Sequence, residues 1–223
     1  MAKAYLICNS NKFKQSDFFV PIQKELFESE GESEVSIKLH KENFHLNFDQ
    51  YLCHNDFIHN TRGRVFNRDF NYYIEPLSFY SYYRENKNLL YIQTKTEAAL
   101  DYISKLNKTH EYGLDPVSVN FNKMIPHITE VAGVWIADLK RINLKTAGYF
   151  GPNVHRSEEY KEAAAEGNVS SIHIKYIGDK TRKEHYIVIS NKGSVILYDS
   201  FQTLEDEIEI VTEVFEKFIY PHL

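Results

Sequence analysis

The fold class is decided by residues 171–199, which read SIHIKYIGDKTRKEHYIVISNKGSVILYD. Over residues 171–176 apolar and polar side chains alternate, which is the period of a half-buried strand. Two further apolar runs, 185–190 and 194–198, are separated by a short turn that ends on Gly193. Glycine there supplies the positive φ that tight hairpins need. The stretch therefore predicts a three-stranded antiparallel meander.

The next segment, residues 203–218 (TLEDEIEIVTEVFEKF), predicts an amphipathic helix. Its apolar residues recur at alternating spacings of four and three, which is the helical period (Leu204, Ile208, Val211, Phe215 and Phe218). Thr203 lies three residues before Asp206, a spacing typical of a helix N-cap. We interpret the acidic outer face of this helix as a solvated face, and a docking surface for a basic partner is the alternative.

Working outward, the remaining signals predict more strands and helices of the same mixed kind. Paired strands are expected at 131–137 and 144–150, with a helix at 158–166 between Ser157 and Gly167. The first half predicts a hairpin of strands 35–39 and 44–48 with its turn at 40–43. A further strand is expected at 72–77. Beyond these, a strand at 89–93 is followed by a helix that begins at Thr94 or Thr96. The fold class is thus α+β, mainly antiparallel sheet with packed helices, ending in the meander and its helix.

The polar run 84–88 (RENKN) is the best candidate for a boundary. It predicts two closely packed lobes: residues 1–87, α+β and rich in aromatic residues, and residues 88–223, also α+β. A single continuous domain is the alternative.

Charge and cysteine content limit the class of protein. The net charge of −5 is accounted for by residues 203–223, which hold six acids and one lysine. A neutral remainder argues against indiscriminate binding of duplex nucleic acid, since phosphate contacts need clustered Lys and Arg. Only two cysteines, Cys8 and Cys53, are present, as in a reduced, cytoplasmic protein. Abundant Asn, Lys, Ile, Tyr and Phe indicate an AT-rich genome, that of a bacterium or its phage.

The sequence lacks the patterns of membrane-spanning segments and of the commonest nucleotide-binding and hydrolase sites. No apolar stretch approaches the roughly 18 residues of a membrane span, so no membrane partner is expected. The sequence contains no glycine-rich nucleotide loop and no GxSxG motif, and no cofactor is predicted.

Two strands of the meander carry a hint about partners. Residues 186–189 and 195–198 are apolar on both faces, and such strands are covered on both faces. The C-terminal helix covers one face. The other is covered by the rest of this chain or by a second protein.

Residues 60–84 are the strongest lead for a binding surface, because arginines are interleaved with aromatic residues. The binding candidates are Arg62, Arg64, Arg68, Tyr72 and Tyr73. Aromatic faces stack on bases while arginines contact phosphates, which suits single-stranded nucleic acid. Tyr and Arg are also the favoured anchors of protein interfaces. Packing of half these rings in a core is the third interpretation.

Candidates for chemistry are fewer. His54, Asp56 and His59 lie close enough in sequence to be metal ligands, although the spacing of five fits neither one helix face nor one strand face. The triplet His173-Ile174-Lys175 has a histidine where nuclease-type sites carry a carboxylate, and simple outward-facing alternation explains the same letters. Cys8, at the end of a strand, is interpreted as a buried structural thiol and not as a nucleophile.

The resulting hypothesis is a non-catalytic protein-interaction or regulatory subunit of an intracellular bacterial or phage-encoded assembly. A protein partner or self-association is expected ahead of nucleic acid. The alternative is a nucleic-acid-binding protein or metal-dependent nuclease that uses segment 60–84.

Overall fold

The structure is a computed structural model that describes residues 2–10, 13, 18–19, 35–110 and 112–223. Its contacts group the chain into two units. We call Cys8–Asp115 the hairpin unit, and Met1–Ile7 with Pro116–Leu223 the meander unit. Each unit combines antiparallel strands with helices, so the predicted α+β class is confirmed.

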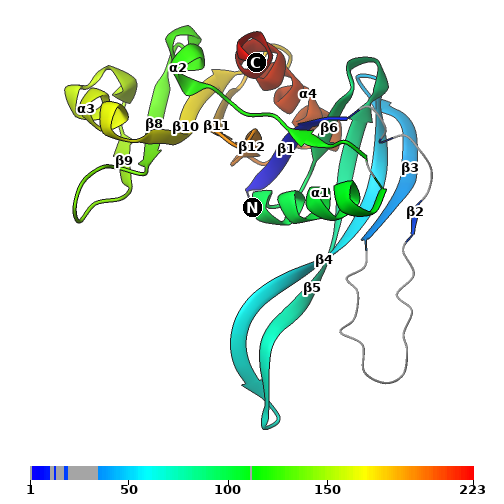
Figure 1. Ribbon diagram of the computed structural model, residues 1–223. Coiled ribbons are helices and arrows are strands. Elements are labelled where there is room, and N and C mark those ends of the chain that lie inside the picture. Colours follow the sequence, from blue (N-terminus) through cyan, green and yellow to red (C-terminus); the bar gives the residue numbers. More distant parts are fainter. Residues whose placement is uncertain (1, 11–12, 14–17, 20–34, 111) are drawn as a thin grey trace. The chain divides into compact units, whose positions relative to one another are not determined.

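The meander unit is built on an antiparallel sheet in the order β1-β12-β11-β10-β8-β9 (Figure 1). Its strands are β1 (Lys3–Asn9, of which the residues to Ile7 belong to this unit), β8 (Val131–Ala137), β9 (Ala147–Phe150), β10 (Asn168–Ile177), β11 (Glu184–Ser190) and β12 (Ser194–Leu197). The predicted meander is β10, β11 and β12. Gly193 in the last turn has φ +80°, a backbone conformation that favours glycine.

Helix α4 (Leu204–Val214) covers one face of this sheet. The Thr203 hydroxyl accepts a hydrogen bond from the Asp206 N–H, as the predicted cap requires. From the sheet, Tyr5 and Tyr176 donate hydroxyl hydrogen bonds to Glu207 and Glu213. Glu207 is buried, so it does not belong to the solvated acidic face that the sequence predicts for this helix.

The other helices of the meander unit are short. They are α2 (Phe121–Met124), α3 (Glu158–Glu166), a π-helical turn (Phe215–Ile219) and single 3-10 turns, and a two-residue strand, β7 (Asp115–Pro116), precedes them. α3 has its predicted bounds, and the Ser157 side chain accepts from the Tyr160 N–H. Among the described residues no helix is both long enough and apolar enough to span a membrane.

The apolar centre of β11 is buried by this chain. Ile187 and Ile189 are fully buried, and Val188, which points to the opposite face, is 5% exposed. No second subunit is required to cover these three residues. Exposed side chains on the face opposite α4 lie elsewhere, at Tyr198 and on the outer strands.

The hairpin unit has strands in the order β2-β3-β4-β5-β6. They are β2 (Phe18–Phe19), β3 (Val35–His45), β4 (Phe48–Val65), β5 (Arg68–Arg84) and β6 (Leu89–Ile92). Helix α1 (Thr96–His110) packs on β3 and β4, and the Tyr102 hydroxyl reaches the Ser36 carbonyl. The polar run 84–88 forms a 3-10 turn (Glu85–Lys87) between paired strands β5 and β6. Division into lobes 1–87 and 88–223 stays a prediction.

Two strand predictions in this unit are corrected. The first turn lies at Leu46–Asn47 instead of 40–43, because β3 continues through its irregular register as far as His45. The strand predicted at 72–77 is only the middle of β5. Pro76 is tolerated there because, among the described residues, β5 pairs on its other side only from Ser81 onward.

Candidate functional site

The most distinctive feature of the hairpin unit is a two-stranded ribbon that we call the arm, residues 56–76 (Figure 1). Pairing of β3 with β4 ends at Val35–Asn55, and beyond this pair β5 is the one strand, among the described residues, with which β4 pairs. Residues 56–65 span roughly 30 Å at the usual strand rise. Such a ribbon gains little stability by itself.

The base of the arm is anchored to α1 by buried polar groups. Asn55 is fully buried, and its amide donates to the Asp101 carboxylate over 3.0 Å. Lys105 donates to the Asn55 side-chain oxygen over 2.9 Å and pairs with Asp101 over 2.7 Å. These bonds fix where β4 leaves the sheet and therefore where the arm starts.

The tip of the arm is a tight two-residue turn. Val65 and Arg68 are paired, and Phe66 and Asn67 between them have φ of 46° and 60°. Left-handed φ at both positions gives a turn that matches the twist of the strands. A phenylalanine is unfavourable in this conformation, yet Phe66 occupies it and is 97% exposed.

The two faces of the arm differ in chemistry, because directly opposed residues of an antiparallel pair share a face. One face carries the pairs Ile58–Ile74, Asn60–Tyr72, Gly63–Phe70 and Val65–Arg68. The Phe70 ring lies over Gly63, where a Cβ would meet it at 2.3 Å. We call this the apolar face. The opposite, polar face carries Phe57–Glu75, His59–Tyr73 and Arg64–Asp69.

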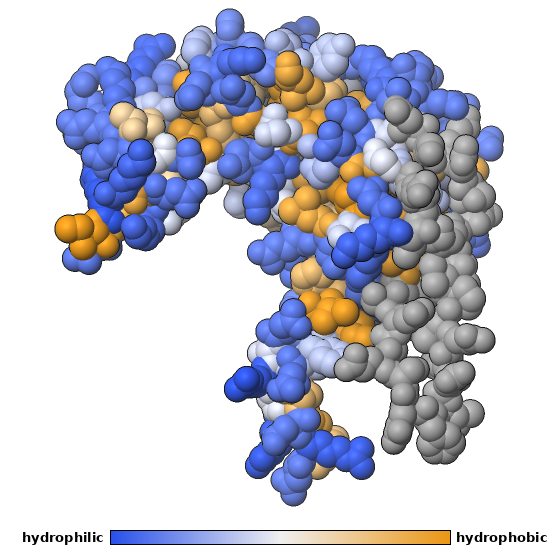
Figure 2. Space-filling model, viewed as in Figure 1, coloured by the Kyte–Doolittle hydropathy of each residue, from blue (hydrophilic) through white to orange (hydrophobic). Residues whose placement is uncertain are grey.

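Apolar side chains on the arm are left open to solvent. On the apolar face the exposed residues are Ile58 (37%), Ile74 (38%), Tyr72 (42%) and Val65 (53%). Figure 2 shows hydrophobic side chains along the ribbon among the polar ones. Exposed apolar area gathered on one face commonly marks an interaction surface.

The five predicted binding residues all lie on the arm, but they do not form one site. Tyr72 and Tyr73 are adjacent in a strand and point to opposite faces. Arg68 shares the apolar face with Tyr72, whereas Arg64 shares the polar face with Tyr73. Arg62 lies at a bulge between the pairs of Asn60 and Gly63.

Arg64 is engaged within the arm. Its Nε and Nη2 atoms donate to the two oxygens of Asp69 over 2.6 and 3.2 Å. The hydrogen bond from Arg64 lowers the pKa of the Asp69 carboxyl. A phosphate would therefore have to displace an internal partner to bind the Arg64 guanidinium.

The three predicted metal ligands are separated as well. His54 Nε2 lies 3.1 Å from an Asp56 carboxylate oxygen, on the same face of β4. His59 points to the other face, where it lies 2.6 Å from Glu75 and stacks on Tyr73 at 4.5 Å. Within the described residues, no group of three or more His, Cys, Asp or Glu side chains is placed to hold a metal ion.

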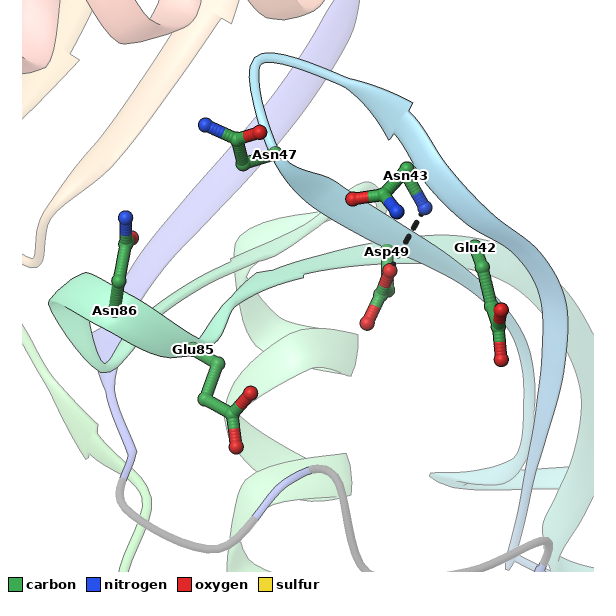
Figure 3. Close-up of a pocket in the computed structure, with 6 residues that line it drawn as sticks. All are labelled: Glu42, Asn43, Asn47, Asp49, Glu85 and Asn86. Atoms are coloured by element: carbon green, nitrogen blue, oxygen red, sulfur yellow. Dashed lines mark hydrogen bonds between the residues drawn. The ribbon is translucent and has the colours of Figure 1, made fainter.

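An acidic pocket of about 330 Å³ lies at another place in the hairpin unit (Figure 3). It is lined by residues of the β3–β4 hairpin and of the turn after β5: Glu42, Asn43, Asn47, Asp49, Glu85 and Asn86. The Asp49 carboxylate accepts a hydrogen bond from the Asn43 N–H over 2.9 Å. The pocket was not anticipated from the sequence, because its acids come from three separate segments.

Both thiols are buried. Burial, followed by the charge of Asp115, raises the pKa of Cys8 far above its ordinary value. Burial raises the pKa of Cys53 to about 11, against the opposing effect of its hydrogen bond with Ser81. Both thiols therefore stay protonated at neutral pH, which supports the structural interpretation of Cys8.

The triplet His173-Ile174-Lys175 lies on β10 with alternating sides, as the sequence predicts. His173 Nδ1 lies 3.0 Å from the Tyr186 hydroxyl, and Lys175 lies 3.4 Å from Glu130. Burial lowers the pKa of His173 below its ordinary value of 6.5. The imidazole is therefore neutral near pH 7.

This shift predicts that acid destabilises the meander unit. Because the pKa of His173 is lower in the folded chain, the unfolded chain takes up the proton first. Its contribution to stability is complete above about pH 6.5 and falls as the pH drops toward the folded pKa. We expect the urea midpoint of the parent protein to fall more between pH 7.5 and 5 than that of His173→Phe. If the urea midpoint falls equally in the parent and in His173→Phe, the pKa of His173 is the same in the folded and the unfolded chain.

In comparisons with known proteins, no protein-family model matches the chain, and no curated protein matches it. The function is therefore argued from the geometry of the structure.

Proposed function

We propose that this chain is a non-catalytic protein-interaction or regulatory subunit of an intracellular bacterial or phage-encoded assembly, and that the arm is its docking element. The observation that carries the proposal is the exposed apolar face of a two-stranded ribbon, with Phe66 at its tip. Burying these side chains against a protein removes apolar area from water, which is the main favourable term in association. The partner is a different protein or a second copy of the chain.

The chemistry of the apolar face favours a protein over nucleic acid. Ile58, Ile74 and Val65 offer neither a ring for stacking nor a charge for phosphate. Arg64, one of the three arginines, is engaged by Asp69. A cytoplasmic location belongs to the same proposal, and the two free, buried cysteines support it.

Native mass spectrometry of the chain, purified gently at low salt from cells that contain its partners, tests the proposal. The parent protein is expected at a mass above 26.2 kDa, as a dimer or with a second protein. Tyr72 and Tyr73 provide a matched pair of variants, since they are neighbours of similar exposure (42% and 46%) on opposite faces. We expect Tyr72→Ser to weaken association by about 10-fold or more, and Tyr73→Ser to leave it unchanged.

Three outcomes contradict the proposal. The first is a parent protein that is always monomeric, and the second is equal association of the two variants. The third is a nucleic acid or metal bound at the arm in place of a protein, which would favour the alternative function at segment 60–84.

A further inference from the structure

A row of aromatic rings crosses the sheet of the meander unit on the face opposite α4. Each ring lies within 6.0 Å of the next, measured between ring centroids. Four of the rings come from neighbouring strands: Phe150 from β9, Trp135 from β8, His173 from β10 and Tyr186 from β11, and the fifth, Tyr198, directly follows β12. Four strand spacings make the row roughly 19 Å long.

Two glycines give Phe150 its orientation. Gly133 and Gly148 flank it on paired strands, and a Cβ on Gly133 would meet ring atoms Cδ1 and Cε1 at 2.6 and 2.8 Å. A Cβ on Gly148 would meet Cε2, on the opposite edge of the ring, at 2.9 Å. The ring therefore lies flat across both backbones, with one face turned away from the sheet.

Phe150 contacts two other rings of the row. The rings of Trp135 and His173 are inclined to it by 77° and 83°, which are edge-to-face arrangements. Phe150 is 56% exposed and Trp135 is 40% exposed, which leaves ring surface accessible. An exposed ring that lies flat on the sheet suits a planar ligand group of similar size, which can stack on it.

The other residues on this face show which ligand fits. The aliphatic Val188 is buried, whereas Tyr198 is 52% exposed. Lys175 is paired in register with Tyr186, and its side chain is 40% exposed even though Glu130 lies 3.4 Å away. The surface thus offers rings and a cation, together with one exposed aliphatic side chain, Ile177 (62%), two residues along β10 from Lys175.

More cations lie in the loop that joins β8 to β9. Lys140 and Lys145 are exposed there, and Arg141 is held by Glu166 over 2.6 Å. The loop also carries Ile142, 94% exposed, and Figure 2 shows a hydrophobic group at its tip. β8 ends at Ala137, two residues after Trp135, so the loop begins at the Trp135 end of the row of rings.

We propose that this row of rings is a binding platform for single-stranded nucleic acid, with bases stacked on Phe150 and its neighbours and the phosphate backbone following Lys175 and the lysines of the β8–β9 loop. Stacking on aromatic faces combined with cations along the backbone is the chemistry of single-strand binding. A sugar polymer would use the rings but gain nothing from the lysines. This site is separate from the arm, and the two proposals are tested independently of each other.

Trp135 reports on the platform directly because it is the only tryptophan in the chain. The purified protein is titrated with single-stranded RNA and with single-stranded DNA, both short and of mixed sequence, at low salt. Binding should quench Trp135 fluorescence and raise the anisotropy of a labelled oligonucleotide at the same concentration. The difference between RNA and DNA shows whether the 2′-hydroxyl is read.

Substitutions test whether nucleic acid binds at the row of rings. Phe150→Ala and Tyr198→Ala are expected to weaken binding by roughly 5- to 150-fold each, as loss of one stacked base does elsewhere. Lys175→Gln should weaken binding and reduce the slope of log K against log salt by roughly 0.7. Tyr220→Ala, at an exposed ring (66%) outside the row, is the matched control and should bind as the parent does. Circular dichroism checks that each variant is folded.

The proposal is overturned by any of four results. These are no quenching by either single strand, tighter binding of duplex than of single strands, and full binding by folded Phe150→Ala and Tyr198→Ala. The fourth is quenching by a neutral oligosaccharide, such as a β-linked glucose hexamer, with no response to nucleic acid.

Discussion

Phe66→Gly is expected to weaken association through the arm by about 30-fold while leaving the fold slightly more stable. Phe66 is 97% exposed at the tip, so in a docked arm it is a large apolar anchor that glycine removes. Its φ of 46° is a conformation that costs a bulky residue about 1–2 kcal/mol. Glycine relieves this cost but adds freedom to the unfolded chain, which leaves a net gain of about 0.5 kcal/mol.

The opposite signs of the two effects make this prediction specific. A substitution that damages the arm lowers both stability and association, whereas this one lowers association alone. Association is measured by native mass spectrometry or analytical ultracentrifugation, and stability by urea denaturation. Undiminished association of Phe66→Gly would mean that the tip does not dock.

Leu46→Gly is the matched control. Leu46 and Asn47 form the same kind of turn, with φ of 49° and 61°, between β3 and β4. The substitution relieves the same backbone cost at a place outside the arm. It should therefore leave association unchanged, and any loss of binding here would indicate a second contact near that turn.

The parts of the fold that the sequence predicts are those with complete local signals. β10, β11, β12 and α3 each have a clear period and a recognisable cap or turn residue, such as Ser157 or Gly193. The arm was missed because its turn is Phe66–Asn67, and phenylalanine is not a turn residue. Without that turn, β4 and β5 do not read as one long hairpin.

The candidate sites depend on register, which local patterns do not specify. Tyr72 and Tyr73 look like one aromatic pair in the sequence, but alternation places them on opposite faces. The ring row has the converse problem. Its members are up to 63 residues apart in sequence, Trp135 to Tyr198, and only the pairing of β8 to β12 brings them together.

Glu207→Ala is expected to lower the free energy of unfolding by about 2–3 kcal/mol, the largest change in stability that we predict. Glu207 is 2% exposed, and it accepts the Tyr5 hydroxyl hydrogen bond over 2.6 Å and pairs with Lys3. Alanine removes both interactions and leaves space under α4. The expected loss of stability is smaller than for a fully buried ion pair because the Lys3 side chain is 43% exposed. Urea denaturation measures the loss.

Two further variants separate the contributions. Glu207→Gln keeps an acceptor for Tyr5 but removes the charge opposite Lys3, so its effect should be about half that of alanine. Glu205→Ala, on the same turn of α4 but partly exposed, should cost less than about 1 kcal/mol. The position of Glu207 explains the contrast. It lies three residues after Leu204 and four before Val211, on the apolar stripe itself. An acid at that position points into the sheet. If Glu207→Ala lowered the free energy of unfolding as little as Glu205→Ala does, the position of β1 would not depend on Glu207.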